Sequence, residues 1–91
     1  MPKYVIERDL PGAGELSSDD LQSIAAKSNQ VIAELGPEIR WLTSYVTADK
    51  LYCVYVAPDE EILVEHANCG GFPIGRVSKV AEVIDPSTAG L

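Results

Sequence analysis

The hydrophobic pattern of the chain is clearest where an unbroken apolar run passes directly into an acidic segment. Residues 51–57 read Leu-Tyr-Cys-Val-Tyr-Val-Ala, and residues 58–61 read Pro-Asp-Glu-Glu. A strand without polar alternation has both of its faces covered. In a short chain, helices of the same chain supply one cover. We expect a second copy of the chain to supply the other.

The remaining pattern predicts two helices and three further strands. Ser17 and Asp20 form a capping-box spacing before a helix whose apolar residues recur at helical intervals, and Gly36-Pro37 ends it. Pro58 opens the second helix, and Gly70-Gly71 ends it. Strand-forming residues bounded by turn signals predict the other strands over residues 3–9, 39–47 and 77–84.

The predicted order is strand, helix, strand, strand, helix, strand, which is the ferredoxin-like βαββαβ arrangement of an α+β fold. It consists of a four-stranded antiparallel sheet with both helices on one face. We expect a single domain over residues 1–86 and a loose tail over residues 87–91. Because the helices leave the other sheet face bare and apolar, we predict a homodimer in which two such faces meet as a dimeric α/β barrel.

Composition narrows the classes of partner. The chain has 91 residues and a formal net charge of -7, which argues against a nucleic-acid surface built from clustered Lys and Arg. No segment approaches the roughly 20 apolar residues of a membrane span, and the N-terminus does not resemble a secretion signal. We therefore expect a cytoplasmic protein without a nucleic-acid or membrane partner. In that compartment, Cys53 and Cys69 are expected to be free thiols.

His66 is the only histidine, and the spacing of Ile62 and Leu63 places it on the apolar side of its helix. One interpretation is a core histidine satisfied by backbone or by a neighbour such as Glu65. The other is a metal ligand. Cys53 lies about 13 Å from its strand end and His66 about 10 Å into the following helix, so the two lie at nearly the same level. If Cys53 points toward the helices, both side chains suit zinc, nickel or copper.

Two further residues on the same helix are candidate metal ligands. Cys69 follows His66 by three residues, which places the two on adjacent turns, although a structural zinc site normally has two such ligand pairs. Glu65 belongs to an acidic helix face with Glu60 and Glu61. That face is either solvated or cation-binding.

Glu7 lies on a central strand, where a buried carboxylate needs a cation, a hydrogen-bond donor or a metal. An arginine, namely Arg8, Arg40 or Arg76, is one possible partner. Alternatively, Glu7, Tyr55, Cys53 and His66 line a pocket between the sheet and the helices. Such a pocket would suit a small-ligand-binding module or a cofactor-free oxygenase-like enzyme. No pattern in the chain indicates a nucleophile or a nucleotide site, so we predict no catalytic residue.

Several segments resemble the small actinobacterial nickel-binding protein family, a domain family long of unknown function. They include Tyr4-Val-Ile-Glu-Arg8, Tyr52-Cys-Val-Tyr55, Glu65-His-Ala67 and Gly70-Gly-Phe-Pro73, and the likeness extends through Asp85-Pro86. The resemblance implies a dimeric ferredoxin-like α/β barrel and bound nickel. It favours a non-catalytic nickel-binding or transition-metal-binding protein for storage or sensing, with zinc and copper as alternative metals.

Overall fold

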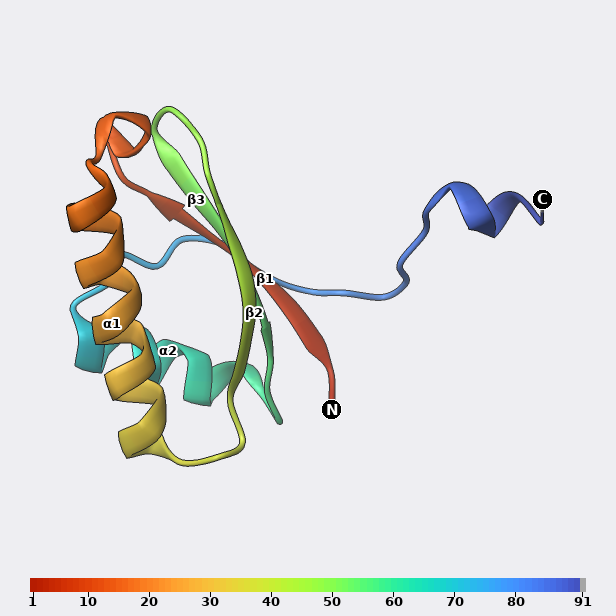
Figure 1. Ribbon diagram of the computed structural model, residues 1–91. Helices are drawn as coiled ribbons and strands as arrows, with labels where there is room; N and C mark the ends of the chain where they lie inside the picture. Colours follow the sequence, from red (N-terminus) through yellow and green to blue (C-terminus); the bar gives the residue numbers. More distant parts are fainter. Residues whose placement is uncertain (91) are drawn as a thin grey trace.

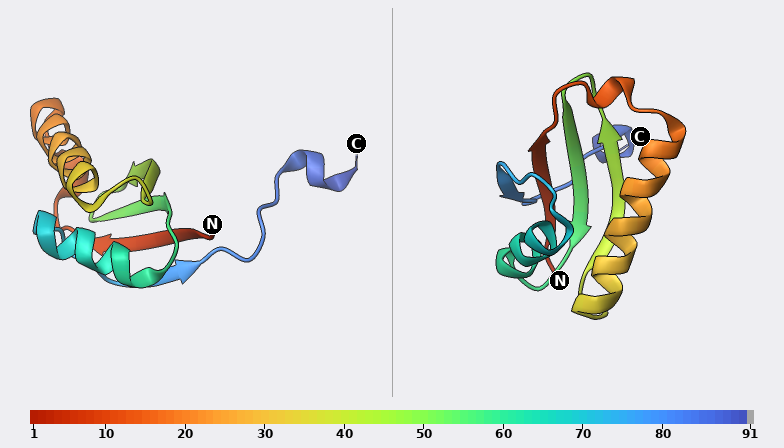
Figure 2. Two further views of the ribbon diagram at one scale, coloured as in Figure 1. Left: turned by 90° about the horizontal axis from the view of Figure 1, so that it is seen from below. Right: turned by 90° about the vertical axis from the view of Figure 1, so that its left-hand side faces the viewer.

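A computed structural model describes residues 1–90 and has one antiparallel sheet with the strand order β2-β3-β1-β4. Both helices cover the same face of this sheet (Figures 1 and 2). The predicted ferredoxin-like α+β fold is therefore confirmed. The strands are β1 (Lys3–Asp9), β2 (Arg40–Val46), β3 (Lys50–Val56) and β4 (Val77–Lys79), the helices are α1 (Ser18–Leu35) and α2 (Glu60–Gly70), and the 3-10 turns are η1 (Ala13–Glu15) and η2 (Pro86–Ala89).

The helix boundaries follow from local capping. Ser17 Oγ accepts a hydrogen bond from the Asp20 amide at 3.1 Å, and the Asp20 carboxylate accepts one from the Ser17 amide at 3.2 Å. This is the predicted capping box. The second helix begins after Pro58 rather than at it, because Asp59 is the cap and its carboxylate accepts from the Ile62 amide at 3.0 Å. Neither helix among residues 1–90 combines the length and hydrophobicity that crossing a bilayer requires.

The core lies between the helices and the sheet. Side chains of a strand alternate between its faces, so Leu51, Cys53 and Tyr55 of β3 are buried on the helix side. Tyr52 and Val54 face the other way and are only partly buried. The helices of one chain thus cover one side of the apolar run. We call the opposite side the open sheet face.

The fourth strand is shorter than predicted. It ends at Lys79 rather than Ile84, after which the Val80 amide still donates to the Lys3 carbonyl at 2.8 Å. Lys3 is the first residue of β1, so the neighbouring strand provides no further backbone partner. Residues 80–90 form an arm that leaves the sheet on the side away from the helices (Figure 1).

The end of this arm contains a 3-10 turn. Asp85 caps η2, which includes part of the predicted loose tail over residues 87–91, and Leu91 lies outside the described residues. Two apolar side chains of the arm are largely exposed, Val83 at 65% and Ile84 at 79%.

Candidate functional site

A cavity of about 390 Å³ lies between α1 and the sheet. Small-molecule pockets commonly measure about 300–1,000 Å³ and are mostly apolar with a few polar groups, which describes this cavity well. Its walls come from α1, from β1, β2 and β3, and from the segment after α2. The lining residues are Arg8, Leu10, Leu21, Ile24, Ala25, Ser28, Trp41, Ser44, Val46, Leu51, Cys53, Tyr55, Gly71, Phe72 and Pro73.

Helix α1 contacts α2 and also forms one wall of the cavity. Ser28 and Val31 are the only buried residues of this helix. Leu21 and Ile24, which the helical spacing predicts to face inward, line the cavity and remain partly exposed. Helical periodicity alone would assign Leu21 and Ile24 to a packed core, whereas in the structure they form part of the cavity wall.

Arg8 is the only charged residue of the cavity wall and is 2% exposed. Its Nη1 donates to the Pro73 carbonyl at 2.8 Å, and its Nη2 donates to the Tyr55 hydroxyl at 3.4 Å. The guanidinium carbon lies 5.6 Å from the Phe72 ring centroid. Both ion pairs found within residues 1–90 belong to Lys50, so Arg8 has no carboxylate partner there.

His66 lies behind this wall and is fully buried. Its Nε2 is 3.1 Å from the Ser28 hydroxyl, and its ring centroid is 5.5 Å from that of Tyr55 and 5.4 Å from that of Phe72. Its Nδ1 is buried and has no hydrogen-bond partner within residues 1–90. Burial lowers the pKa of His66 below its usual 6.5, and the nearby Arg8 charge lowers this pKa further. The imidazole is therefore neutral at pH 7.

The four predicted metal ligands occupy two places. Cys53 and His66 are buried, and Cys53 lines the cavity, whereas Cys69 and Glu65 are exposed on α2. Both cysteines are free, as predicted. Residues 1–90 contain no group of three or more His, Cys, Asp or Glu side chains placed to hold a metal ion.

The interior does not fit a divalent ion. The Arg8 charge that lowers the pKa of His66 would also oppose a cation beside that ring. The unpartnered Nδ1 of His66 is one free donor atom, which is not a coordination sphere. The four residues therefore do not form a single metal centre within one chain.

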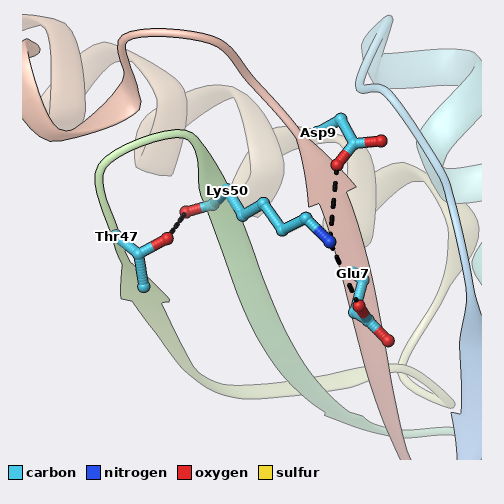
Figure 3. A network of polar contacts seen from close by, with 4 residues as sticks. All are labelled: Glu7, Asp9, Thr47 and Lys50. Atoms are coloured by element: carbon cyan, nitrogen blue, oxygen red, sulfur yellow. Dashed lines mark hydrogen bonds and ion pairs between the residues drawn. The ribbon is translucent and has the colours of Figure 1, made fainter.

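Glu7 lies on the open sheet face and not in the cavity. Lys50 Nζ lies 3.5 Å from the Glu7 carboxylate and 3.7 Å from that of Asp9 (Figure 3). Asp9, then Tyr52 and Glu7, raise the pKa of Lys50. The partner of Glu7 is thus a lysine and not one of the predicted arginines. Of the proposed pocket residues, Tyr55 and Cys53 line the cavity together, and Glu7 is separated from them by the sheet.

The fold and cavity define a small ferredoxin-like α+β domain with a predominantly apolar cavity. The family model described as nickel responsive protein SCO4226-like matches residues 4–80, so the chain belongs to this family. The crystal structure of SCO4226 from Streptomyces coelicolor A3(2) is similar in fold, with a TM-score of 0.76 and 13% identity over 90% of this chain and 99% of that chain. The comparison with curated proteins found no match.

The buried His66 leads to a pH prediction. Because its folded-state pKa is depressed, the unfolded chain binds the proton first, so stability is full above pH 6.5 and falls as the pH drops toward the folded pKa. In that range the free energy of unfolding falls by up to about 1.4 kcal/mol per pH unit. Urea unfolding at pH 7, 6 and 5 should show a smaller acid-side loss in His66→Gln than in the parent, and equal losses would contradict a buried neutral imidazole.

Proposed function

We propose that this protein is a non-catalytic, cytoplasmic nickel-binding protein that stores or senses the metal and works as a homodimer. Membership of the nickel-responsive SCO4226-like family is the observation that carries the proposal. Nickel is the first metal to test. Zinc and copper accept the same thiolate, imidazole and carboxylate ligands and are the competing metals.

The exposed side of α2 is the more favourable place for the ion. Glu65 and Cys69 are four residues apart on this helix, so their side chains are neighbours on its surface. A carboxylate and a thiolate there are free of the Arg8 charge that disfavours the interior. Two ligands per chain leave the remaining coordination positions to water, so binding is expected to be weak and exchangeable. That behaviour suits sensing better than tight storage.

Calorimetric titration of untagged protein with nickel chloride tests this assignment. We expect the double variant Glu65→Gln/Cys69→Ser to bind nickel at least about 10-fold more weakly than the parent, because it loses both ligands. Asp19→Asn, which removes one exposed carboxylate from α1, is the control and should bind like the parent. Elemental analysis of the purified protein identifies the metal.

His66→Gln separates the two possible places. It should retain nickel binding if the Glu65 and Cys69 side chains hold the ion. If folded, dimeric His66→Gln loses nickel while the double variant keeps it, the buried Cys53 and His66 side chains are the ligands instead. If untagged parent binds no nickel at millimolar concentration, the metal-binding function is wrong.

The open sheet face supports the homodimer. Tyr52, Val54 and Val5 contribute partly buried side chains to it, and Tyr45 of β2 is largely exposed. The C-terminal arm also leaves the sheet on this side (Figure 1). A face-to-face dimer would cover these apolar groups, which a monomer leaves in water.

The cavity favours a second candidate function, that of a small-ligand-binding module or a cofactor-free oxygenase-like enzyme. The observation behind it is a mostly apolar space of about 390 Å³. Trp41 lines this space, and its Nε1 donates to Ser44 Oγ at 2.9 Å. Because Trp41 is the only tryptophan, a ligand that enters should change the intrinsic fluorescence of the protein.

A further inference from the structure

We propose that the cavity binds an organic monoanion, a carboxylate on a compact apolar body, and that Arg8 pairs with the carboxylate. This proposal rests on the second candidate function, in which the cavity is a ligand site. It does not depend on nickel binding. It assigns a chemical class to the ligand and a role to a residue that pattern analysis considers only as a possible partner of Glu7.

The charge of Arg8 is unbalanced within residues 1–90. A guanidinium stays ionised in proteins, and a buried ion without a counter-ion is costly. Both hydrogen bonds that Arg8 makes go to neutral oxygens, those of Pro73 and Tyr55. A guanidinium has five N–H donors in a planar fork that can bind a carboxylate bidentately. Because Arg8 uses two of them in these bonds, donors remain for a ligand. The side chain is therefore suited to an anion that residues 1–90 do not supply.

The nearest acidic residues along the chain cannot serve as that anion. Glu7 and Asp9 flank Arg8 on β1, and successive strand side chains point to opposite faces. Both carboxylates lie on the open sheet face, where they pair with Lys50 (Figure 3). The sheet itself separates them from the guanidinium. A ligand entering the cavity meets Arg8 without competition from these groups.

The residues of the cavity wall indicate the chemistry of the rest of the ligand. Leu21, Ile24, Trp41 and Leu51 present apolar surface, so the body of the ligand is apolar. One charged residue in the wall balances one negative charge. A hydrated inorganic anion would lose its water shell against these apolar walls and regain few hydrogen bonds beyond those of Arg8, whereas a carboxylate on an apolar body places only its charged end at the guanidinium. The match is a monocarboxylate and not phosphate or a cation.

Octanoate and 1-octanol are the probes, since they have similar apolar chains and differ in charge. We expect Trp41 fluorescence and calorimetry to show octanoate binding at least about 10-fold more tightly than 1-octanol. Arg8→Met keeps most of the stem length and removes the charge. It should weaken octanoate binding by roughly 10- to 100-fold, the range for a lost charge-assisted hydrogen bond, and leave 1-octanol binding nearly unchanged.

The control is Arg40→Met, which removes the same charge from an exposed position on β2 and should bind octanoate like the parent. Arg8→Lys retains the charge but lacks the planar fork of donors. Its octanoate affinity should therefore lie between those of the parent and Arg8→Met. Circular dichroism checks the fold of each variant. Octanoate should also raise the melting temperature of the parent and not that of Arg8→Met.

These measurements test separately whether the cavity binds a ligand and whether Arg8 recognises an anion. If neither probe binds the parent, the cavity is not a ligand site and the second candidate function fails with this proposal. If both probes bind the parent equally, the cavity function stands and the anion assignment is wrong. Equal octanoate losses in Arg40→Met and Arg8→Met would also overturn the role of Arg8. If Arg8→Met does not fold, the parent probe comparison and Arg8→Lys still decide.

Discussion

Val54→Asp is expected to convert the proposed homodimer into a monomer. Val54 lies on the central strand β3, in register with Val5 of β1 and Thr43 of β2, and faces away from the helices. In a face-to-face dimer its carboxylate would be buried in the interface, where Lys50 already pairs with Glu7 and Asp9, and burying an unpaired ion costs several kcal/mol. Light scattering at micromolar concentration should report twice the 9.8 kDa chain mass for the parent and the single chain mass for the variant.

Val64→Asp provides the matched control for this substitution. Val64 is exposed on α2, which covers the other face of the sheet, so the same new charge stays in water there. This variant should remain dimeric. A dimeric Val54→Asp would exclude the open sheet face as the interface, and a monomeric parent would remove the homodimer from the proposed function.

Leu63→Ala is expected to lower the free energy of unfolding by about 2–5 kcal/mol, the usual range for a fully buried leucine. Leu63 has no exposed surface and belongs to the core that joins α2 to β1 and β3. Urea unfolding at pH 7 measures the change. The neighbouring Val64→Ala should stay within about 0.5 kcal/mol, because Val64 is at the surface. A loss below about 1 kcal/mol for Leu63→Ala would mean that α2 is not held by this contact.

The fold could be predicted because its helices begin and end at short-range sequence signals. The Ser17 and Asp20 capping box and the Gly36 stop lie within a few residues of the features they define, so pattern analysis located α1 closely. The end of β4 depends instead on where β1 begins, a contact between residues 3 and 80 that no local pattern encodes. The predicted extension to Ile84 failed for that reason.

The candidate site was less accessible to sequence analysis. The sequence places Cys53 and Tyr55 on a strand, but it does not reveal which face of that strand is buried, because the run is apolar on both sides. The sequence also places Glu7 on the same face as Val5, and this count also assigns Arg8 to the face of Tyr4 and Ile6. The count alone does not show that this face is buried, so the burial of Arg8 emerged only from the structure. The cavity itself depends on how α1, the sheet and residues 71–73 pack together, which periodicity does not describe.

Gly70 determines where one wall residue of the cavity, Phe72, can lie. A methyl group at this position would collide with the ring of Phe72, the side chain that faces Arg8 and His66. Glycine lets the aromatic ring rest directly against the last turn of α2. Alanine would push the ring toward or away from the cavity, although residue 70 is not part of the cavity wall. One added methyl group at residue 70 would therefore alter the space inside the cavity while every wall residue stays the same.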